Sequence, residues 1–331
     1  MSIQNLKFIS QYLGKRKNLV QCAGGNTSLK LNKHLIIKSS GMWLKDTYEK
    51  NIFTKINTEN LEPKIKKLKF LSEKDLLTNN NMKASIETPL HLLLKSKYVV
   101  HYHPVNLNVI LIKNDALSFL KKNFKDKNWI YVKYFKPGNL LYKKVGQKLR
   151  NNQDEKKIIF LQNHGVFIGS ETITDCLKKI RKINFITKHK EKKFTCKSSI
   201  LKKYSLKYKM KIPKYFKINS LATNTISYNI CSRKSGMLFP DQVVFLGKKM
   251  HCITEKQLSK TKKIEVDFLI IKNVGVLISK KAKIETIELL LYMSKVLLRL
   301  KNQKKVNFLS SREIISLINW KDEKYRIKLS R

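Results

Sequence analysis

The motif His101-Tyr-His103 is the part of the sequence that most directly suggests chemistry. In an extended strand, residues two apart point to the same face, so the two imidazoles would stand side by side. Such a pair can bind one divalent cation, because imidazole nitrogen is a common ligand of zinc. Pro104 follows directly, which predicts that the strand ends where a site can open. Taken alone, the motif is more often a pair of core or surface histidines.

Two further residues strengthen the metal interpretation. His164 follows an apolar run at 156–161 and lies in an Asn-His-Gly turn, so it could supply a third nitrogen. Glu87 begins the segment that leads into the His101 strand, and its carboxylate could be a ligand, a general base, or each in turn. Three histidines leave a coordination position open, which is typical of catalytic metal sites. His91, one helical turn after Glu87, could orient that carboxylate, although a histidine packed on the sheet is slightly favoured.

Three polar turns are candidates for binding an anion. Residues 24–28 (GGNTS) combine consecutive glycines with side-chain donors, and free backbone N–H groups can converge on an anion there. Ser40-Gly41 and Ser85 offer similar donors. The spacing fits neither the Walker phosphate loop nor the dinucleotide fingerprint. Each motif alone is more often an ordinary tight turn or helix cap.

Strands and helices alternate along the chain, which predicts an α/β or α+β fold. Residues 2–19 show helical spacing of apolar side chains, and 29–31 with 35–38 are typical of a hairpin. Ser85 is expected to cap a helix over 87–95, followed by a strand over 98–103. The remaining expected elements are a helix at 115–124, strands at 129–135 and 156–161, a helix from Thr172 to about 190, a strand at 266–272 and a helix at 283–300.

Residues 158–169 and 268–279 resemble each other, each being strand, Asn-x-Gly turn and strand before a helix. Val274 stands where the first copy has His164, so the C-terminal region is either a degenerate partial repeat or a chance match. The expected domains are a metal-binding domain at 1–190, a linker or peripheral excursion at 191–230, and a smaller α/β region at 231–331.

The composition is that of a globular protein, with 42% hydrophobic residues. The net charge of +47 could attract nucleic acid or an anionic membrane, but lysines spread over the whole chain favour a codon-bias explanation. We therefore expect no specific nucleic-acid partner and no membrane association. The five cysteines lack framework spacing, and the N-terminus lacks a secretory apolar run, so a cytoplasmic location without disulfides is expected.

Six motifs in this order make the chain similar to the class II aldolase/adducin family over about residues 1–190. Their joint occurrence is far more specific than any one of them. They are GGNTS at 24–28, SG at 40–41, SIETPLH at 85–91, HYHP at 101–104, YFKPG at 134–138 and NHG at 163–165.

The resemblance implies an α/β/α sandwich around a central, mainly antiparallel sheet, assembled as a homo-oligomer. It implies Zn²⁺, or another divalent metal, on His101, His103 and His164, with Glu87 as the catalytic acid/base. Ile86 and the lack of a clear proton-donating tyrosine depart from the family pattern; Tyr131 and Tyr134 are candidates. The implied substrate-binding residues are Gly25, Asn26, Ser40, Gly41 and Ser85.

The hypothesis from sequence is thus a metal-dependent lyase of carbohydrate metabolism. It would cleave a small hydroxycarbonyl compound of the sugar-phosphate type by retro-aldol chemistry, through a zinc-stabilised enediolate. One alternative is an epimerase or dehydratase that uses the same metal on a ketose phosphate. Another is a non-catalytic, adducin-like binding protein, because a fold by itself does not select a function.

Overall fold

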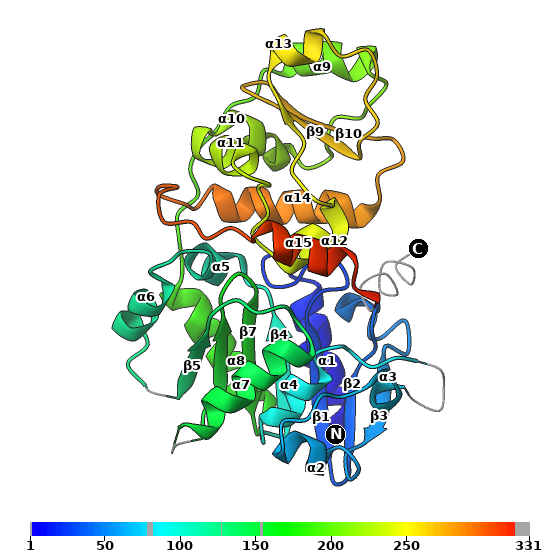
Figure 1. Ribbon diagram of the computed structural model, residues 1–331, viewed down its shortest axis with the longest axis vertical. Coiled ribbons are helices and arrows are strands. Elements are labelled where there is room, and N and C mark those ends of the chain that lie inside the picture. Colours follow the sequence, from blue (N-terminus) through cyan, green and yellow to red (C-terminus); the bar gives the residue numbers. More distant parts are fainter. Residues whose placement is uncertain (1, 78–81, 127, 153–154, 322–331) are drawn as a thin grey trace. The chain divides into compact units, whose positions relative to one another are not determined.

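The computed structural model describes residues 2–77, 82–126, 128–152 and 155–321. The chain forms two compact units (Figure 1). Unit 1 contains the described residues of 1–111, 115–188 and 320–331, and unit 2 those of 112–114 and 189–319. Each unit is described below by itself.

Unit 1 is built on a seven-stranded sheet with the order β3-β2-β1-β4-β7-β6-β5. All neighbouring strands are antiparallel except β5 and β6, which are parallel. This confirms the expected, mainly antiparallel sheet. The strands are β1 (Asn26–Leu31), β2 (His34–Lys38), β3 (Phe53–Asn57), β4 (Tyr98–Tyr102), β5 (Trp129–Val132), β6 (Ile158–Leu161) and β7 (Gly165–Ser170).

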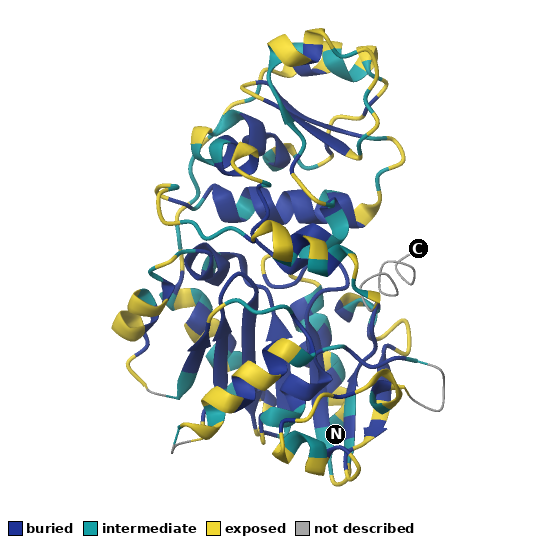
Figure 2. Cartoon of the chain, viewed as in Figure 1, coloured by how far each residue is buried: buried dark blue, intermediate teal, exposed yellow. Residues whose placement is uncertain are grey.

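Helices cover both faces of this sheet, because side chains alternate along its buried strands. On one face, Val100 of β4 packs in a cluster with residues of α1 (Ser2–Gly14) and α8 (Ile173–Ile186). On the other face, Val99 packs with residues of α4 (Thr88–Leu93) and α7 (Asn139–Arg150). The central strands are buried on both faces (Figure 2). The α/β/α sandwich is therefore confirmed.

The other helices of unit 1 are short and lie in connections. Of these, only α6 was predicted from the sequence; α7 and the strand β3 were not predicted either, because their apolar spacing is mixed with lysine. These helices are η1 (Leu44–Asp46), α2 (Glu62–Lys66), α3 (Glu73–Leu76), α5 (Val105–Leu111) and α6 (Ala116–Asn123).

Unit 2 is a separate α/β part with a three-stranded sheet, in the order β10-β9-β8. Within residues 191–230, expected as a linker or excursion, Leu201, Ile218 and Leu221 are buried in the helices that this segment forms. Its strands are β8 (Cys252–Ile253), β9 (Phe268–Ile271) and β10 (Gly275–Ile278). Its helices are α9 (Ser198–Lys207), η2 (Phe216–Asn219), α10 (Ser220–Thr223), α11 (Thr225–Ser232), α12 (Pro240–Leu246), α13 (Glu255–Ser259), α14 (Ile284–Leu297) and α15 (Ser311–Ile318).

Most predicted elements are present with shorter bounds. The N-terminal helix ends at Gly14, because residues 16–20 close a turn in which the Leu19 N–H donates to the Arg16 carbonyl. Thr172 caps α8 as expected, its side chain accepting from the Asp175 N–H. The expected helix at 87–95 begins one residue late, with Glu87 as its N-cap.

Two features of the described chain concern membranes and cysteines. No described helix is long and apolar enough to cross a membrane. All five cysteines are free thiols in this structure.

Candidate metal centre

Three histidines from two distant segments of unit 1 meet at one place. His101 lies in β4 on the face of Val99, toward α4, and His103 follows one residue after that strand ends. His164 lies in the turn between β6 and β7. Because β4 pairs with β7, with Tyr102 opposite Val166, this turn is placed beside the two histidines of β4.

The three imidazoles are close enough to share one ion. The Nε2 atoms of His101 and His103 are 2.9 Å apart. The ring centroid of His164 is 4.9 Å from that of His101 and 5.2 Å from that of His103. One ligand atom from each residue lies within 4.8 Å of the others, and all three side chains are buried. Nitrogens bound to one ion at about 2.0–2.1 Å must lie roughly 3 Å apart, so these distances fit with small adjustments.

The carboxylate of Glu87 faces the same point. Its Oε2 lies 3.3 Å from His101 Nε2, and its Oε1 lies 3.4 Å from His164 Nε2. Glu87 is the N-cap residue of α4 and is 6% exposed. A buried carboxylate bridging two imidazoles can accept a proton, coordinate a cation, or both.

The hydrogen bond of His101 sets which nitrogen is available. Its Nδ1 lies 3.1 Å from the Val166 carbonyl, which can only accept, so Nδ1 carries the proton and Nε2 presents its lone pair to the site. Burial, with the neighbouring His103 and His164, holds the pKa of His101 well below its usual 6.5. A neutral ring with one unprotonated nitrogen is the state that binds a metal.

The turn that carries His164 depends on two backbone features. Asn163 adopts a left-handed conformation with φ of 53°, which asparagine tolerates better than most residues. A Cβ on Gly165 would lie 2.5 Å from the Tyr102 carbonyl oxygen and 2.7 Å from His103 Cδ2. Glycine therefore allows β7 to approach the end of β4. Asn108 of α5 holds the turn by donating from Nδ2 to the His164 carbonyl at 2.9 Å.

The three polar turns that the sequence indicated as candidates for substrate binding lie partly together. Asn26 Nδ2 donates to Ser85 Oγ at 3.1 Å and to Glu87 Oε2 at 2.8 Å. Ser40 and Ser85 lie on paired segments, since the Ser40 N–H donates to the Lys83 carbonyl at 2.8 Å. Gly25 and Gly41 both have positive φ, of 63° and 78°.

Sequence reasoning missed a lysine that joins the two glycine turns. Lys38 is 2% exposed, and its Nζ donates to the Ala23 carbonyl at 2.9 Å and to the Met42 carbonyl at 2.7 Å. It thereby holds the segment before Gly25 next to the segment after Gly41. Lys38 stands at the end of β2, directly before Ser39-Ser40-Gly41, and this position could have indicated a role at the turn. Lysine is so abundant in this sequence that a single one does not stand out.

The two tyrosine candidates lie differently. Tyr131 packs in the cluster formed with α1 and α8, on the opposite face of the sheet from His101, and burial raises its pKa to about 12. Tyr134 lies nearer, because its N–H donates to Gln162 Oε1 at 3.2 Å, two residues before His164. The structure thus separates Tyr131 from the candidate metal centre.

The sandwich fold and its buried cluster of histidines and a carboxylate define a recognisable class of protein. Residues 8–189 match the family model described as Class II Aldolase and Adducin N-terminal domain. The chain belongs to this family, as its motifs indicated.

Three relatives illustrate how far the similarity extends. An uncharacterised oxidoreductase of Bacillus subtilis, YuxG, is 24% identical over 193 residues, which are 54% of this chain and 28% of that protein. The solved N-terminal class II aldolase domain of a Thermoplasma acidophilum protein is 24% identical and covers 56% of this chain and 91% of its own, with a TM-score of 0.46. A sugar-phosphate aldolase from Thermotoga maritima is 16% identical, covering 62% and 96%, with a TM-score of 0.43. This chain thus spans little more than a quarter of the curated relative that it matches.

Proposed function

We propose that this protein is a metal-dependent lyase that cleaves a small hydroxycarbonyl compound by retro-aldol chemistry. The observation that carries the proposal is the meeting of three buried imidazoles with one carboxylate, whose oxygens lie 3.3 and 3.4 Å from two imidazole nitrogens. A binding scaffold would have no need of such a buried donor set, since burying ionisable groups is costly unless they have partners.

His101, His103 and His164 would hold the metal, for which zinc is the favoured ion because three nitrogen ligands with an open position suit it. Once bound, the metal would act as a Lewis acid that stabilises negative charge on the substrate oxygens. Glu87 would move the proton, because its carboxylate is within reach of the same point and is aimed by the Asn26 amide. The low exposure of these side chains would keep water from the reacting atoms.

A sugar phosphate is the substrate class that we propose. Gly25, Asn26, Ser40, Gly41 and Ser85 would bind its phosphate, in line with the Thermotoga maritima relative that is a sugar-phosphate aldolase. Asn26 and Ser85 are already in contact, and Lys38 holds the two glycine turns together. We further propose a homo-oligomer, as in the family that the motifs resemble.

Metal analysis tests the site itself. We expect about one zinc per purified chain, and loss of that zinc in His101→Ala or His103→Ala, because a three-ligand site cannot spare a ligand. His34→Ala is the matched control, since His34 lies in β2 and is no member of the cluster. A parent chain that binds no divalent metal would favour the adducin-like binding protein instead.

Turnover tests the reaction. A panel of ketose phosphates is incubated with the zinc-loaded chain, and aldehyde release is followed. Glu87→Gln should keep the metal while lowering turnover by ~100-fold or more, if the carboxylate is the general base. Formation of an epimer or a dehydrated product without aldehyde would replace the lyase with one of the alternative reactions.

A further inference from the structure

One face of strand β1 holds the helix that carries Glu87. Asn26, Ser28 and Lys30 alternate along this strand and therefore share a face. All three bond to α4 or its flanking residues, as described below. Thr27 and Leu29, on the opposite face, contact α1 and its cluster instead, with Thr27 Oγ1 lying 2.7 Å from Ser10 Oγ.

His91 lies at the centre of these contacts. Ser28 Oγ is 2.7 Å from His91 Nδ1, and His91 Nε2 is hydrogen-bonded to Asn26 Oδ1. Asn26 in turn donates from Nδ2 to Glu87 Oε2 at 2.8 Å. Ser28 and His91 are both 0% exposed, so these bonds have no competition from water. A continuous buried chain thus runs from Ser28 through His91 and Asn26 to Glu87.

The donors and acceptors available on these side chains fix the direction of each hydrogen bond between Ser28 and Glu87. A carboxylate only accepts, so Asn26 must turn its NH₂ group toward Glu87 and its oxygen toward His91. That oxygen needs a donor, so the proton of His91 is on Nε2. Burial, with the nearby Lys30 ammonium, holds the pKa of His91 well below 6.5, so the ring is neutral and Nδ1 accepts from the Ser28 hydroxyl. The other neutral tautomer would break the bond to Asn26, because an unprotonated Nε2 cannot donate to the amide oxygen.

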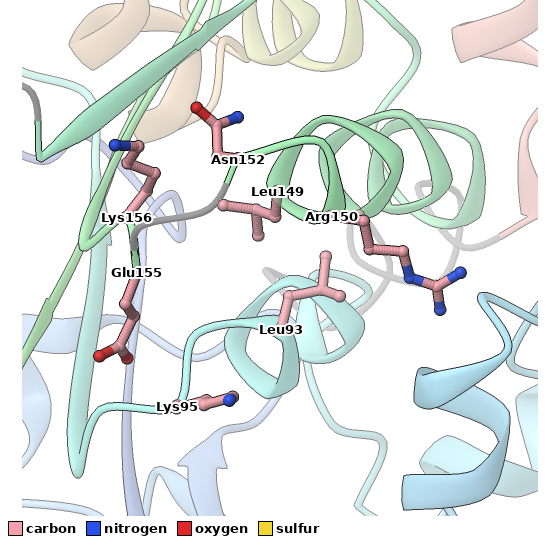
Figure 3. A pocket seen from close by; sticks show the side chains of 8 residues that line it. Leu93, Lys95, Leu149, Arg150, Asn152, Glu155 and Lys156 are labelled. Carbon is pink, nitrogen blue, oxygen red and sulfur yellow. The ribbon is translucent and has the colours of Figure 1, made fainter.

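Lys30 holds the other end of the same helix. Its Nζ donates to the carbonyls of His91 at 2.8 Å, of Ser96 at 3.0 Å and of Leu94, the C-cap of α4. The His91 and Leu94 carbonyls belong to the end of the helix, where carbonyls lack an intrahelical partner, and Ser96 lies two residues beyond the C-cap. Two hollows border this end: a cavity of about 510 Å³ that Lys30 lines, and one of about 340 Å³ (Figure 3). Leu93 and Lys95 line both cavities, so the C-terminal end of α4 has little protein packed around it there. The hydrogen bonds from Lys30 hold this end of the helix in place.

We propose that Ser28, His91 and Lys30 are positioning residues, which set the carboxylate of Glu87 through Asn26 and through both ends of α4. This inference rests on the proposed role of Glu87. His91 then acts on Glu87 through the Asn26 amide, which differs from both a histidine that only packs on the sheet and one that bonds to the Glu87 carboxylate directly. Outer partners of this kind typically change activity by ~10–100-fold, because small displacements of a reacting group are costly.

A pair of variants on opposite faces of β1 provides the kinetic test. Ser28→Ala and Thr27→Val each remove one buried hydroxyl contact from the same strand. With zinc-loaded protein and a ketose phosphate that the parent cleaves, we expect Ser28→Ala to lower kcat by ~10-fold with KM nearly unchanged. Thr27→Val should keep the parental kcat. Equal kcat losses in the two variants would show that only strand packing matters.

Replacing His91 tests the donor directly. His91→Leu removes the bond to Asn26, whereas His91→Gln keeps an N–H donor at similar reach. We expect His91→Gln to recover part of the kcat that His91→Leu loses, with both variants retaining zinc. Failure of His91→Gln to exceed His91→Leu would contradict a donor role for His91.

Nuclear magnetic resonance of ¹⁵N-labelled histidine in the parent protein tests the hydrogen bonds of His91 and needs no measurement of turnover. We expect the His91 ring to be neutral and protonated on Nε2 at pH 7.5, with a resonance that changes in Ser28→Ala but not in Thr27→Val. A neutral His91 ring protonated on Nδ1 alone would overturn the proposal, because its Nε2 could not donate to Asn26. If the tautomer is as expected but no ketose phosphate is cleaved, the positioning chain stands and the proposed lyase function fails.

Discussion

The β6–β7 hairpin of unit 1 and the β9–β10 hairpin of unit 2 are two versions of one local structure. In the first, Leu161 pairs with Gly165, and in the second, Ile271 pairs with Gly275. The turn residue Asn163 has a φ of 53°, and Asn273 has one of 59°. Each hairpin has a parallel strand beside its first strand and a 14-residue helix after its second. The resemblance seen in the sequence therefore corresponds to the same strand register and turn.

The two hairpins differ in what lies beside their second strand. In unit 1, β7 also pairs with β4, which brings His101 and His103 to the turn. In unit 2, β10 is an edge strand of the described sheet, with a single bridge from Ile278 to Lys211. At the turn, His164 reaches the candidate metal centre, whereas Val274 is fully buried in an apolar cluster.

This difference shows that the hairpin is only a scaffold. A strand, a left-handed asparagine and a glycine position the middle residue of the turn, but they do not supply its partners. A zinc site typically needs at least three protein ligands at one point, and here two of the three candidate ligands come from β4 and the residue directly after it. Four experiments would break or sharpen the comparison.

The largest effect is expected from giving the first hairpin the residue of the second. His164→Val removes one of three nitrogens, so zinc affinity should fall by more than ~100-fold, measured by competition with a chromophoric chelator. His34→Val is the control and should bind zinc like the parent. An unchanged affinity in His164→Val would remove His164 from the site.

The glycines of the two turns should differ in their effects when replaced. The Cβ of Gly165→Ala would meet the Tyr102 carbonyl oxygen at 2.5 Å, so β4 must move, with a loss of about 3 kcal/mol and weaker zinc binding. The Cβ of Gly275→Ala would meet the side chains of Leu201 at 2.8 Å and Asn219 at 2.9 Å, which can shift. We expect a loss of about 1 kcal/mol there and unchanged zinc binding.

Urea unfolding and zinc titration of both glycine variants make this comparison. Equal losses of stability, or zinc binding unaffected in Gly165→Ala, would show that the approach of β7 to β4 does not shape the metal centre.

The reverse exchange should create no second site. Val274→His puts an imidazole at a position with 0% exposure among apolar side chains, which should cost about 2 kcal/mol. Zinc content should stay at the parental value. Lys272→His, at an exposed position of the same turn, is the control and should unfold like the parent. A second zinc bound by Val274→His would show that the hairpin alone can build a site.

The smallest effect concerns the asparagines. Asn273→Ala should lose about 1 kcal/mol, because alanine is strained at a φ of 59°, and Asn273→Gly should be nearly neutral. Asn163→Gly should cost more than Asn273→Gly, because Asn163 is fully buried and its side chain would leave a void. Thermal unfolding of the three variants provides the measurement. If Asn163→Gly is as stable as the parent, the side chain of Asn163 contributes nothing to stability and only its backbone conformation matters.

Much of the local structure could be predicted from the sequence. Thr172 was identified as the cap of α8, and β4 was identified from its β-branched and aromatic residues. Side-chain alternation also predicted that His101 and His103 would share a direction. These features depend on residues close together in the chain, so their physics is readable locally. Element ends were less accurate, and β3 and α7 were missed where lysines obscure the apolar pattern.

The sequence by itself determined the donor types and the local directions of their side chains: two imidazoles two residues apart, a third in a glycine turn, and a carboxylate at a helix start. Only the tertiary structure decided that β4 lies between β1 and β7, so that Asn26, His101 and His164 become neighbours. It also decided that Lys30 and Lys38 have structural roles among many lysines. The reason is that backbone hydrogen bonds between strands are the same for every sequence, so which strands pair is settled by burial across the whole domain.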